Sequence, residues 1–590
     1  MRRNIFTATV IMLLCLAALP LFPQMPRRSV DLRSQEPSWQ AVIGGNAVSP
    51  CIETSYGVAL LSDGRLLSAC TSSGTVIWQK SVKGRPSPYL ASFGDFLYVV
   101  TDSSHLNLVN PSGVTLWTAV CPFGIEDFPL VGRDGRVFVR GKRGLACYGL
   151  DGKRKWRADT PELAQLPVCS LDDGSILVFL KAPKEGRTVA NHYSPFGEKL
   201  EDITFSGIVA SAESCDRGAL VSLANGSVGL VSIKDDGTAG SVWVNGSGNP
   251  SGAFKISVSA VTGNAAFFFQ NGARTEALIV RTEDGFLLNR FQVGQIASSD
   301  FKIAKPTRAG FFISGAYAAC EFGEDGTIFY AALLPPSAKW SSIFYTEQNH
   351  IILCMKDWTM KGFRMSQTTG SAVSGVKKDA RPISYVSRID LDPELLESGV
   401  RPLSDRRMAE ISRALAAGDY GPREREYLSL IKTEAENYVG VHSMRPSPQG
   451  GGRISFFAEN PVYTQNLLYL MSRTGTREFS LYFARLLSEK DDDGQLLSVI
   501  AFAGDCAYDE DGEILAALEA LLLSKVQPSQ AAVLKEICDT TYKICSFMGR
   551  PTLNRQGKGI ISRMLMPQYD KTTNSYARKT LEKLAAAERK

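Results

Sequence analysis

Between about residue 39 and residue 380, the chain alternates short apolar runs with clusters of glycine, aspartate, asparagine and serine. The runs 58–61 (Val-Ala-Leu-Leu) and 96–100 (Phe-Leu-Tyr-Val-Val) are representative. Apolar runs of about four to six residues bounded by turn-forming residues indicate β-strands. The pattern therefore predicts a β-rich region made of many short strands.

One turn recurs through this region at nearly constant intervals. In its clearest form a glycine precedes a tryptophan by four positions, and the three tryptophans lie 39 residues apart. These pairs are Gly74 with Trp78, Gly113 with Trp117, and Gly152 with Trp156. The glycine alone recurs eight times, at Gly74, Gly113, Gly152, Gly197, Gly237, Gly285, Gly326 and Gly370. Eight occurrences spaced by about 42 residues predict eight structural repeats.

A second turn glycine precedes the first within most repeats. Asp134-Gly135 and Asp173-Gly174 show it most plainly, because each is followed by an apolar run that resembles a buried strand. The full set is Gly64, Gly94, Gly135, Gly174, Gly218, Gly263 and Gly310, with Asn349 in the last repeat. Two hairpin turns per repeat imply four strands, which is the composition of a β-propeller blade. An eight-bladed propeller is predicted, and seven blades stay open because the last repeats are irregular.

The segment Gly152-Lys153-Arg154-Lys155-Trp156, preceded by Ala146-Cys147-Tyr148, resembles the tryptophan-docking repeat of quinoprotein-like (PQQ-like) propellers. The resemblance covers roughly residues 40–380 and implies a propeller domain over residues 39–388. It also implies that the glycine turn and the tryptophan of successive blades pack together. The implied structural blade-docking residues are Gly74, Trp78, Gly113, Trp117, Gly152, Trp156, Gly326 and Tyr330. Later repeats depart from the pattern: Trp243 follows Gly237 by six positions, Gly285 leads to Phe291, and Gly370 has no aromatic partner.

Propellers often complete one blade with strands from both ends of the domain. We therefore expect the segment from Trp39 to Val48 to pair with strands near Ser384–Ile389.

The composition changes to a helical pattern after the predicted propeller. We assign residues 389–443 to a helical connector, residues 444–453 to a Pro/Gly-rich linker and residues 454–590 to an α-helical domain. Residues 477–490 align with residues 512–525 at an offset of 35, sharing a glutamate, a Leu-Leu core and a final lysine. Helix pairs repeating at this interval resemble HEAT-type repeats, and an ordinary helical bundle is the alternative.

The first residues form a separate segment. Arg2 and Arg3 precede an uncharged, mostly apolar run from Ile5 to Phe22. This order is typical of an export signal. Residues 1–30 are interpreted as a signal peptide, an uncleaved membrane anchor, or a segment lipidated at Cys15. Each interpretation places the rest of the chain outside the cytoplasm, in the periplasm or cell envelope, with membrane contact through this segment.

Composition narrows the classes of function. Apolar content of 44% and charged content of 21% are those of a soluble globular protein. A net charge of +5 over 590 residues argues against a nucleic-acid binder, which would carry a concentrated basic face. Of the 12 cysteines, 11 follow Cys15. Most are interpreted as small buried apolar residues, and one or more disulfides are the alternative.

Catalytic and metal-binding patterns are sparse. The four histidines are dispersed, and the sequence contains no HExxH, P-loop, GxSxG or CxxC motif. The acidic runs 491–493 and 509–511 lack the spaced ligands of a calcium loop and are expected to be solvated loops. Quinoprotein dehydrogenases hold PQQ above calcium against a disulfide between adjacent cysteines, and this chain has no adjacent cysteine pair. We therefore assign no catalytic residue, cofactor or metal.

These observations lead to one functional hypothesis and one rival. The hypothesis is an exported, membrane-associated, non-catalytic scaffold or protein-interaction module that binds other cell-envelope proteins. It resembles in class the propeller lipoprotein of outer-membrane β-barrel assembly. The rival is a PQQ-dependent dehydrogenase or another cell-envelope enzyme that uses the propeller channel.

Overall fold

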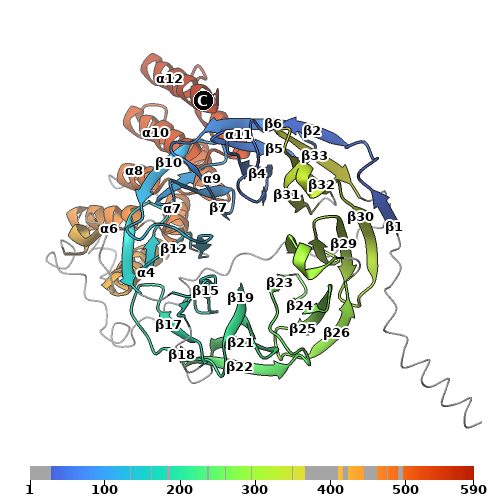
Figure 1. The fold of residues 1–590 in the computed structure, drawn as a ribbon. Coiled ribbons are helices and arrows are strands. Elements are labelled where there is room, and N and C mark those ends of the chain that lie inside the picture. Colours follow the sequence, from blue (N-terminus) through green and yellow to red (C-terminus); the bar gives the residue numbers. More distant parts are fainter. Residues whose placement is uncertain are drawn as a thin grey trace, which may run out of the picture. The chain divides into compact units, whose positions relative to one another are not determined.

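The computed structural model describes residues 28–365 and parts of the following helical region (Figure 1). The described part excludes residues 133, 161–162, 182–185, 235–237, 260, 294–295 and 348–349 within the first range. Beyond residue 365 it comprises residues 410–415, 423–443, 461–474, 476–489 and 496–589. Gly237, Gly370, Asn349, the segment Ser384–Ile389 and the predicted linker lie outside the described residues.

Eight sheets, each containing four antiparallel strands, form the blades of an eight-bladed β-propeller, which confirms the predicted fold class and blade number. The first blade contains β3 (Ile52–Thr54), β4 (Gly57–Leu61), β5 (Leu66–Cys70) and β6 (Val76–Ser81). The second contains β7 (Pro86–Phe93), β8 (Phe96–Thr101), β9 (His105–Val109) and β10 (Thr115–Val120). The third contains β11 (Leu130–Val131), β12 (Val137–Gly141), β13 (Gly144–Tyr148) and β14 (Arg154–Asp159). The fourth contains β15 (Cys169–Ser170), β16 (Ile176–Phe179), β17 (Val189–Tyr193) and β18 (Ile203–Thr204).

The later blades follow the same order of strands. The fifth contains β19 (Val209–Cys215), β20 (Gly218–Leu223), β21 (Ser227–Ile233) and β22 (Ala239–Gly246). The sixth contains β23 (Lys255–Ser259), β24 (Asn264–Asn271), β25 (Arg274–Arg281) and β26 (Leu287–Gln292). The seventh contains β27 (Ile303–Pro306), β28 (Gly310–Ser314), β29 (Ala318–Gly323) and β30 (Ile328–Leu333). The eighth contains β31 (Trp340–Tyr345), β32 (His350–Met355), β33 (Thr359–Arg364) and β2 (Trp39–Val42).

The strands of one blade differ in burial according to their position. Middle strands such as β8, β12 and β20 are buried at every residue. This explains their continuous apolar runs, because both faces of a middle strand pack against neighbouring blades. Fourth strands such as β6 and β10 contain several exposed residues among less exposed ones. The core is therefore divided into clusters that lie between the faces of adjacent blades, such as the cluster between the seventh and eighth blades.

The eighth blade is completed by a strand from the beginning of the domain, as expected. The pairing partner is different from the expected one, because β2 pairs antiparallel with β33, in the register Trp39 with Gly362. The fourth strand that would follow β33 in a continuous repeat is thus supplied by β2.

A strand that the sequence analysis did not predict precedes the first blade. The segment β1 (Arg28–Asp31) pairs in parallel with β30, and the seventh blade consequently has five strands (Figure 1). The pairing continues into the next residue, because the backbone N–H of Leu32 donates a hydrogen bond to the carbonyl of Leu333 at 3.0 Å. The outer edge of one blade therefore already carries an added parallel strand.

The helices of the C-terminal region form two stacked rows. Their bounds are α4 (Glu424–Ser443), α6 (Pro461–Arg473), α7 (Glu478–Glu489), α8 (Leu496–Cys506), α9 (Glu513–Ser524), α10 (Ala531–Met548), α11 (Pro551–Arg563) and α12 (Lys571–Arg589). In one row α6, α8, α10 and α12 pack successively, and in the other α4, α7, α9 and α11 do so. The two segments that align at an offset of 35 are α7 and α9, which are neighbours in one row. This arrangement is that of stacked helix pairs. None of the helices in the described residues is both long and apolar enough to cross a bilayer.

The chain forms two compact units. The first comprises residues 1–90, 160–195 and 199–376, and the second comprises residues 91–159, 196–198 and 377–590. The second unit combines strands of the second and third blades with the C-terminal helices. The helical region therefore belongs to the same compact unit as these propeller strands.

Candidate interaction surfaces

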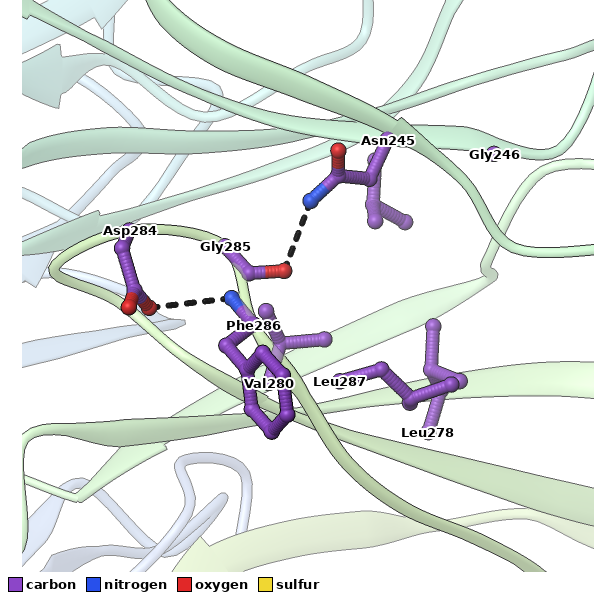
Figure 2. A pocket seen from close by; sticks show the side chains of 9 residues that line it. Asn245, Gly246, Leu278, Val280, Asp284, Gly285, Phe286 and Leu287 are labelled. Carbon is purple, nitrogen blue, oxygen red and sulfur yellow. Dashed lines mark hydrogen bonds between the residues drawn. The ribbon is translucent and has the colours of Figure 1, made fainter.

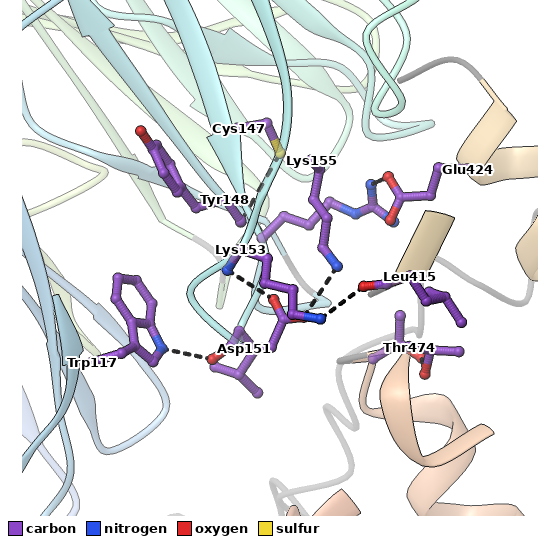
Figure 3. Close-up of polar contacts among 12 residues, drawn as sticks. Trp117, Cys147, Tyr148, Asp151, Lys153, Lys155, Leu415, Glu424 and Thr474 are labelled. Atoms are coloured by element: carbon purple, nitrogen blue, oxygen red, sulfur yellow. Dashed lines mark hydrogen bonds and ion pairs between the residues drawn. The ribbon is translucent and has the colours of Figure 1, made fainter. Parts of the chain in front are cut away.

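The predicted glycines and tryptophans meet between successive blades. Gly152 has a φ of +77°, and a Cβ atom at this position would lie 2.6 Å from Cδ2 of Trp117. The Trp117 ring also donates a hydrogen bond from Nε1 to the carbonyl of Leu150 at 2.8 Å (Figure 3). Only glycine combines this backbone conformation with so close an aromatic ring. Trp117 therefore docks on the turn of the following blade, 35 positions later in the sequence.

The same contact recurs in other blades. A Cβ atom on Gly197 would lie 2.6 Å from Cγ of Trp156, and one on Gly74 would lie 2.5 Å from Cε3 of Trp39. Gly285 and Trp243 make the same contact at 2.6 Å. These are contacts between blades, so the glycine and tryptophan that are four residues apart in sequence do not contact each other in this way.

The remaining predicted docking residues occupy the corresponding strands and turns. Trp78 lies in β6 with 9% of its surface exposed, and Gly113 lies in the turn between β9 and β10 with a φ of +79°. A Cβ atom on Gly326 would lie 2.9 Å from Cδ1 of Phe291. Tyr330 is buried in β30, where its ring centroid lies 6.2 Å from that of Tyr345.

The predicted set omitted Trp243 and Phe291, which dock as described above, and also Trp39 and Asn289. Trp39 contacts Gly74. No glycine turn precedes Trp39, because its strand β2 is far from its pairing partner β33 in the sequence. A usable signal existed, since Trp39 precedes Trp78 by the same 39 positions that separate the later tryptophans. Asn289 takes the place of the tryptophan in β26 and donates from Nδ2 to the carbonyl of Glu324 at 3.3 Å.

Within the second compact unit, a buried ion pair joins the third blade to helix α4. Arg136 Nη1 lies 2.7 Å from Glu424 Oε2, with 6% and 0% of the two side chains exposed. Arg136 Nε also lies 2.6 Å from Asp134 Oδ2. Burial by itself would lower the pKa of Arg136, but the charges of Glu424 and Asp134 raise it well above its usual value. Arg136 is therefore a cation enclosed by two anions.

A lysine of the same blade contacts the segment before α4. Lys153 Nζ donates to the carbonyl of Leu415 at 2.7 Å, and burial lowers the pKa of this lysine (Figure 3). The neighbouring Lys155 instead contacts Asp151 Oδ2 at 3.3 Å.

The end of helix α10 contacts the second blade. Asn110 Nδ2 donates to the carbonyl of Ser546 at 3.1 Å, and Ser112 Oγ donates to the carbonyl of Gly549 at 2.7 Å. Carbonyls at the end of a helix lack partners within the helix, so these side chains satisfy them. Arg550 adds an ion pair with Asp95 at 3.1 Å.

Aromatic rings and acidic residues complete this contact. Phe96 lies with its ring centroid 6.4 Å from Tyr508 and 5.7 Å from Phe547. The expectation that residues 509–511 form a solvated loop is wrong for two of them. Asp509 is 3% exposed and accepts hydrogen bonds from the backbone N–H groups of Ile514 and Leu515, and Glu510 pairs with Arg477 at 2.8 Å. The run 491–493 lies outside the described residues.

A pocket of about 460 Å³ lies between the fifth and sixth blades (Figure 2). Asn245 and Gly246 of β22 line one side, and the turn from Asp284 to Leu287 lines another. Asn245 Nδ2 donates to the carbonyl of Gly285 at 2.6 Å, and the Phe286 N–H donates to Asp284 Oδ1 at 3.0 Å. The floor is apolar, since it contains Val228, Leu278 and Val280.

Apolar side chains are exposed beside this pocket. Phe286, Leu287 and Leu288 are 57%, 51% and 40% exposed. Arg281 lies over the Phe286 ring at 5.3 Å from its centroid. Adjacent exposed apolar residues with a concave pocket and few polar groups are typical of a binding site for an apolar side chain.

The described residues provide little for metal binding or catalysis. They contain no group of three or more histidine, cysteine, aspartate or glutamate side chains arranged to hold a metal ion. The closest approach to a nucleophile–base pair is His192 Nε2 with Ser175 Oγ at 2.7 Å, and Ser175 is fully buried in its blade. Burial raises the pKa of the thiols of Cys70 and Cys320 to about 12, so neither is a thiolate at neutral pH.

Comparison with known proteins finds similarity over part of the chain. Residues 62–200 match the family model described as outer membrane protein assembly factor BamB. The chain resembles the crystal structure of BamB from Moraxella catarrhalis at 12% identity, covering 56% of this chain and 99% of that one, with a TM-score of 0.42. It resembles Sqt1 from Saccharomyces cerevisiae at 12% identity, covering 55% and 97%, with a TM-score of 0.42. The WD40 domain of Neurospora crassa Pan2 matches at 10% identity, covering 47% and 89%, with a TM-score of 0.33. No curated protein matches the chain.

The fold defines the class of protein: an eight-bladed β-propeller followed by a C-terminal helical region. Within that class, the matched repeats resemble those of the BamB family. Propellers of this kind serve in general as protein-interaction scaffolds. The absence of enzymatic activity stays a prediction.

Proposed function

We propose that the protein is an exported, membrane-associated scaffold that binds extended segments of other cell-envelope proteins at the outer edge of its sixth blade. The observation that carries the proposal is the pocket beside β26, with its exposed apolar rim of Phe286, Leu287 and Leu288. No strand among the described residues pairs with the outer edge of β26. The unpaired backbone of an edge strand is suited to bind an added strand.

The occupant we propose is an extended peptide with a large apolar side chain. Support comes from β1, which adds in parallel to the corresponding strand of the next blade. The two edges correspond in register. A bulge at Phe329 precedes the residues of β30 that pair with β1, which are Tyr330 to Leu333. A bulge at Leu288 likewise precedes Asn289 to Gln292 of β26.

Backbone pairing with Asn289–Gln292 would place the peptide beside Leu287, which lines the pocket. An apolar side chain of the peptide would then be buried against Leu278 and Val280, while Asn245 and Asp284 supply polar groups at the rim. Main-chain hydrogen bonds would provide affinity and the pocket would provide specificity.

The binding experiment uses site-specific photocrosslinking in the native cell envelope. A photoreactive phenylalanine analogue at position 286 is expected to capture a partner, and mass spectrometry should identify the crosslinked segment. A synthetic peptide of that segment should then bind the purified full-length protein saturably. Leu287→Asp should weaken this binding at least about tenfold, because a charge would enter the apolar rim.

The matched control places the same analogue at Val42. This residue is 63% exposed on β2, the fourth strand of the eighth blade, and does not line the pocket between the fifth and sixth blades. Equal capture of the same segment from both positions would contradict the proposal. So would a peptide whose affinity is unchanged by Leu287→Asp.

The proposal that the protein is exported rests on the sequence of residues 1–30, most of which lie outside the described residues. A reporter phosphatase that requires disulfides for activity, fused after Lys590, is expected to be active in cells. Deletion of residues 5–22 should abolish that activity, whereas activity after deletion would contradict export through this segment. Washing membranes at high pH would test anchoring, since an anchored protein stays with the membrane.

A further inference from the structure

Two cysteines from opposite ends of the propeller sequence meet in the first compact unit. Cys51 immediately precedes β3 of the first blade, and Cys354 lies in β32 of the eighth. Their Sγ atoms are 3.6 Å apart although the residues are 303 positions apart in the sequence. Both are buried, with 3% and 0% of their surfaces exposed. The contact is therefore located where the first and last blades meet.

We propose that Cys51 and Cys354 form a disulfide that covalently joins the first blade to the last and so closes the propeller. Neither cysteine lies within the residues 62–200 that match the family model. The proposal rests on export, because disulfides persist in oxidising compartments.

The surroundings of Cys51 and Cys354 favour a structural disulfide over a reactive free thiol. The two cysteines belong to an apolar cluster that also contains Ala41 of β2 and Met360 of β33. The hydrogen bond to Cys354, together with burial, raises the pKa of the Cys51 thiol well above its usual value. A thiol in this state is a poor nucleophile once the blades have closed. The bond would therefore form during folding, before β2 completes its pairing with β33.

The chemistry requires a disulfide oxidant, either a protein dithiol oxidase or oxidised glutathione. The Cys51 thiolate attacks the oxidant and forms a mixed disulfide, releasing one thiol. The Cys354 thiolate then attacks Sγ of Cys51 and releases the second thiol. Two protein thiols and one oxidant disulfide thus give one protein disulfide and two reduced thiols, with two electrons passing to the oxidant.

A third cysteine provides the alternative pairing. Cys70 is fully buried in the same cluster. Trypsin separates the three cysteines, because Cys51 falls in residues 34–65, Cys70 in residues 66–80 and Cys354 in residues 340–356. Peptide mapping therefore distinguishes a bond between Cys51 and Cys354 from one that involves Cys70.

The experiment maps cysteines in full-length protein alkylated before reduction. One sample is purified from its native cells, and the other is denatured, reduced and refolded in a mixture of oxidised and reduced glutathione. In both samples we expect residues 34–65 joined to residues 340–356, with residues 66–80 alkylated. Reduction should lower the melting temperature of the wild type and of Cys70→Ala, but it should leave that of Cys51→Ala unchanged.

The possible results test the disulfide proposal and the export proposal separately. If the refolded protein contains the disulfide and the cellular protein does not, the disulfide proposal is supported and export is contradicted. If Cys51 and Cys354 are alkylated in the refolded protein, or if Cys51 is joined to Cys70, the disulfide proposal is overturned. This mapping uses wild-type protein, so it remains decisive even if an alanine variant fails to fold.

Discussion

Arg136 of the third blade and Glu424 of helix α4 form an ion pair from which water is almost fully excluded, with Nη1 and Oε2 2.7 Å apart. The two residues are 288 positions apart in the sequence. Removing one member of a buried pair leaves the other charge without compensation, which is costly. Loss of one carboxylate should therefore weaken the contact between α4 and the third blade.

We expect Glu424→Ala to lower the free energy of unfolding by about 3 kcal/mol. The retained contact between Arg136 and Asp134 keeps the loss at the lower end of the usual range. Urea unfolding followed by circular dichroism at 222 nm measures the helices. Five of the seven tryptophans belong to the first compact unit, so their fluorescence mainly reports blades outside the unit that contains α4. Glu424→Ala should shift the helical transition to lower urea than the fluorescence transition.

The neighbouring residue supplies a matched control. Arg423 pairs with Glu410 at 2.7 Å, but its side chain is 65% exposed. Solvent-exposed ion pairs contribute little to stability, so Arg423→Ala should change the free energy of unfolding by less than about 1 kcal/mol. Equal destabilisation by the two variants would show that burial of the Arg136–Glu424 pair is not what matters.

The contrast between the blades and this ion pair shows what the sequence could predict. Blade number follows from turn glycines such as Gly152, because a hairpin turn with positive φ is a local requirement that leaves a local mark. The contact of Arg136 with Glu424 depends on how helices fold back on strands, and neither residue stands out in its own segment. Sequence reasoning therefore predicted the propeller and the stacked helices, but not the contacts that join them.

The docking residues were predicted only in part. Trp117 and Trp156 were found because each follows its turn glycine by a fixed spacing. Asn289 was missed because it replaces the ring N–H donor with a side-chain amide, which keeps the hydrogen bond and removes the aromatic signal. The apolar rim at Phe286 to Leu288 was missed because exposed and buried apolar strand residues look alike in a single sequence.

Substitution of a docking glycine should lower the free energy of unfolding by more than the substitution of a glycine that has no close neighbours. In Gly152→Ala, the new Cβ would lie 2.6 Å from Trp117 at a φ of +77°. We expect a loss of about 2–4 kcal/mol in thermal or urea unfolding, from backbone strain and displacement of the ring. Gly272→Ala is the control, because its φ is +61° and nothing lies within 4 Å of its Cβ position. Its loss should be about 1 kcal/mol, and equal losses would exclude a docking role for Gly152.

His192 should make the propeller less stable in mild acid. It is 4% exposed, and burial lowers its pKa despite the opposing charges of Asp173 and Asp202. Below an ordinary histidine pKa of about 6.5, the unfolded chain binds a proton that the folded chain does not. The unfolding free energy should therefore fall as pH decreases from 7 to 5. Unfolding measured across this range should show a shallower dependence for His192→Gln.

Parallel profiles for wild type and His192→Gln would mean that His192 does not contribute to acid sensitivity.

Trp39 should be the docking residue on which closure of the propeller depends most. Its ring contacts Gly74 of the first blade and Gly362 of β33, and its strand pairs with β33. Trp39→Ala removes the contact with both glycines, and we expect a loss of about 3 kcal/mol, because the ring is only partly buried. Trp358→Ala, at a residue 57% exposed, should cost no more than about 0.5 kcal/mol. Hydrogen exchange locates the effect: amide protons of β2 and β33 should exchange faster in Trp39→Ala, while those of β20 and β24 keep their protection. Uniform acceleration across all four strands would instead mean that Trp39 stabilises the propeller globally and has no specific role in its closure.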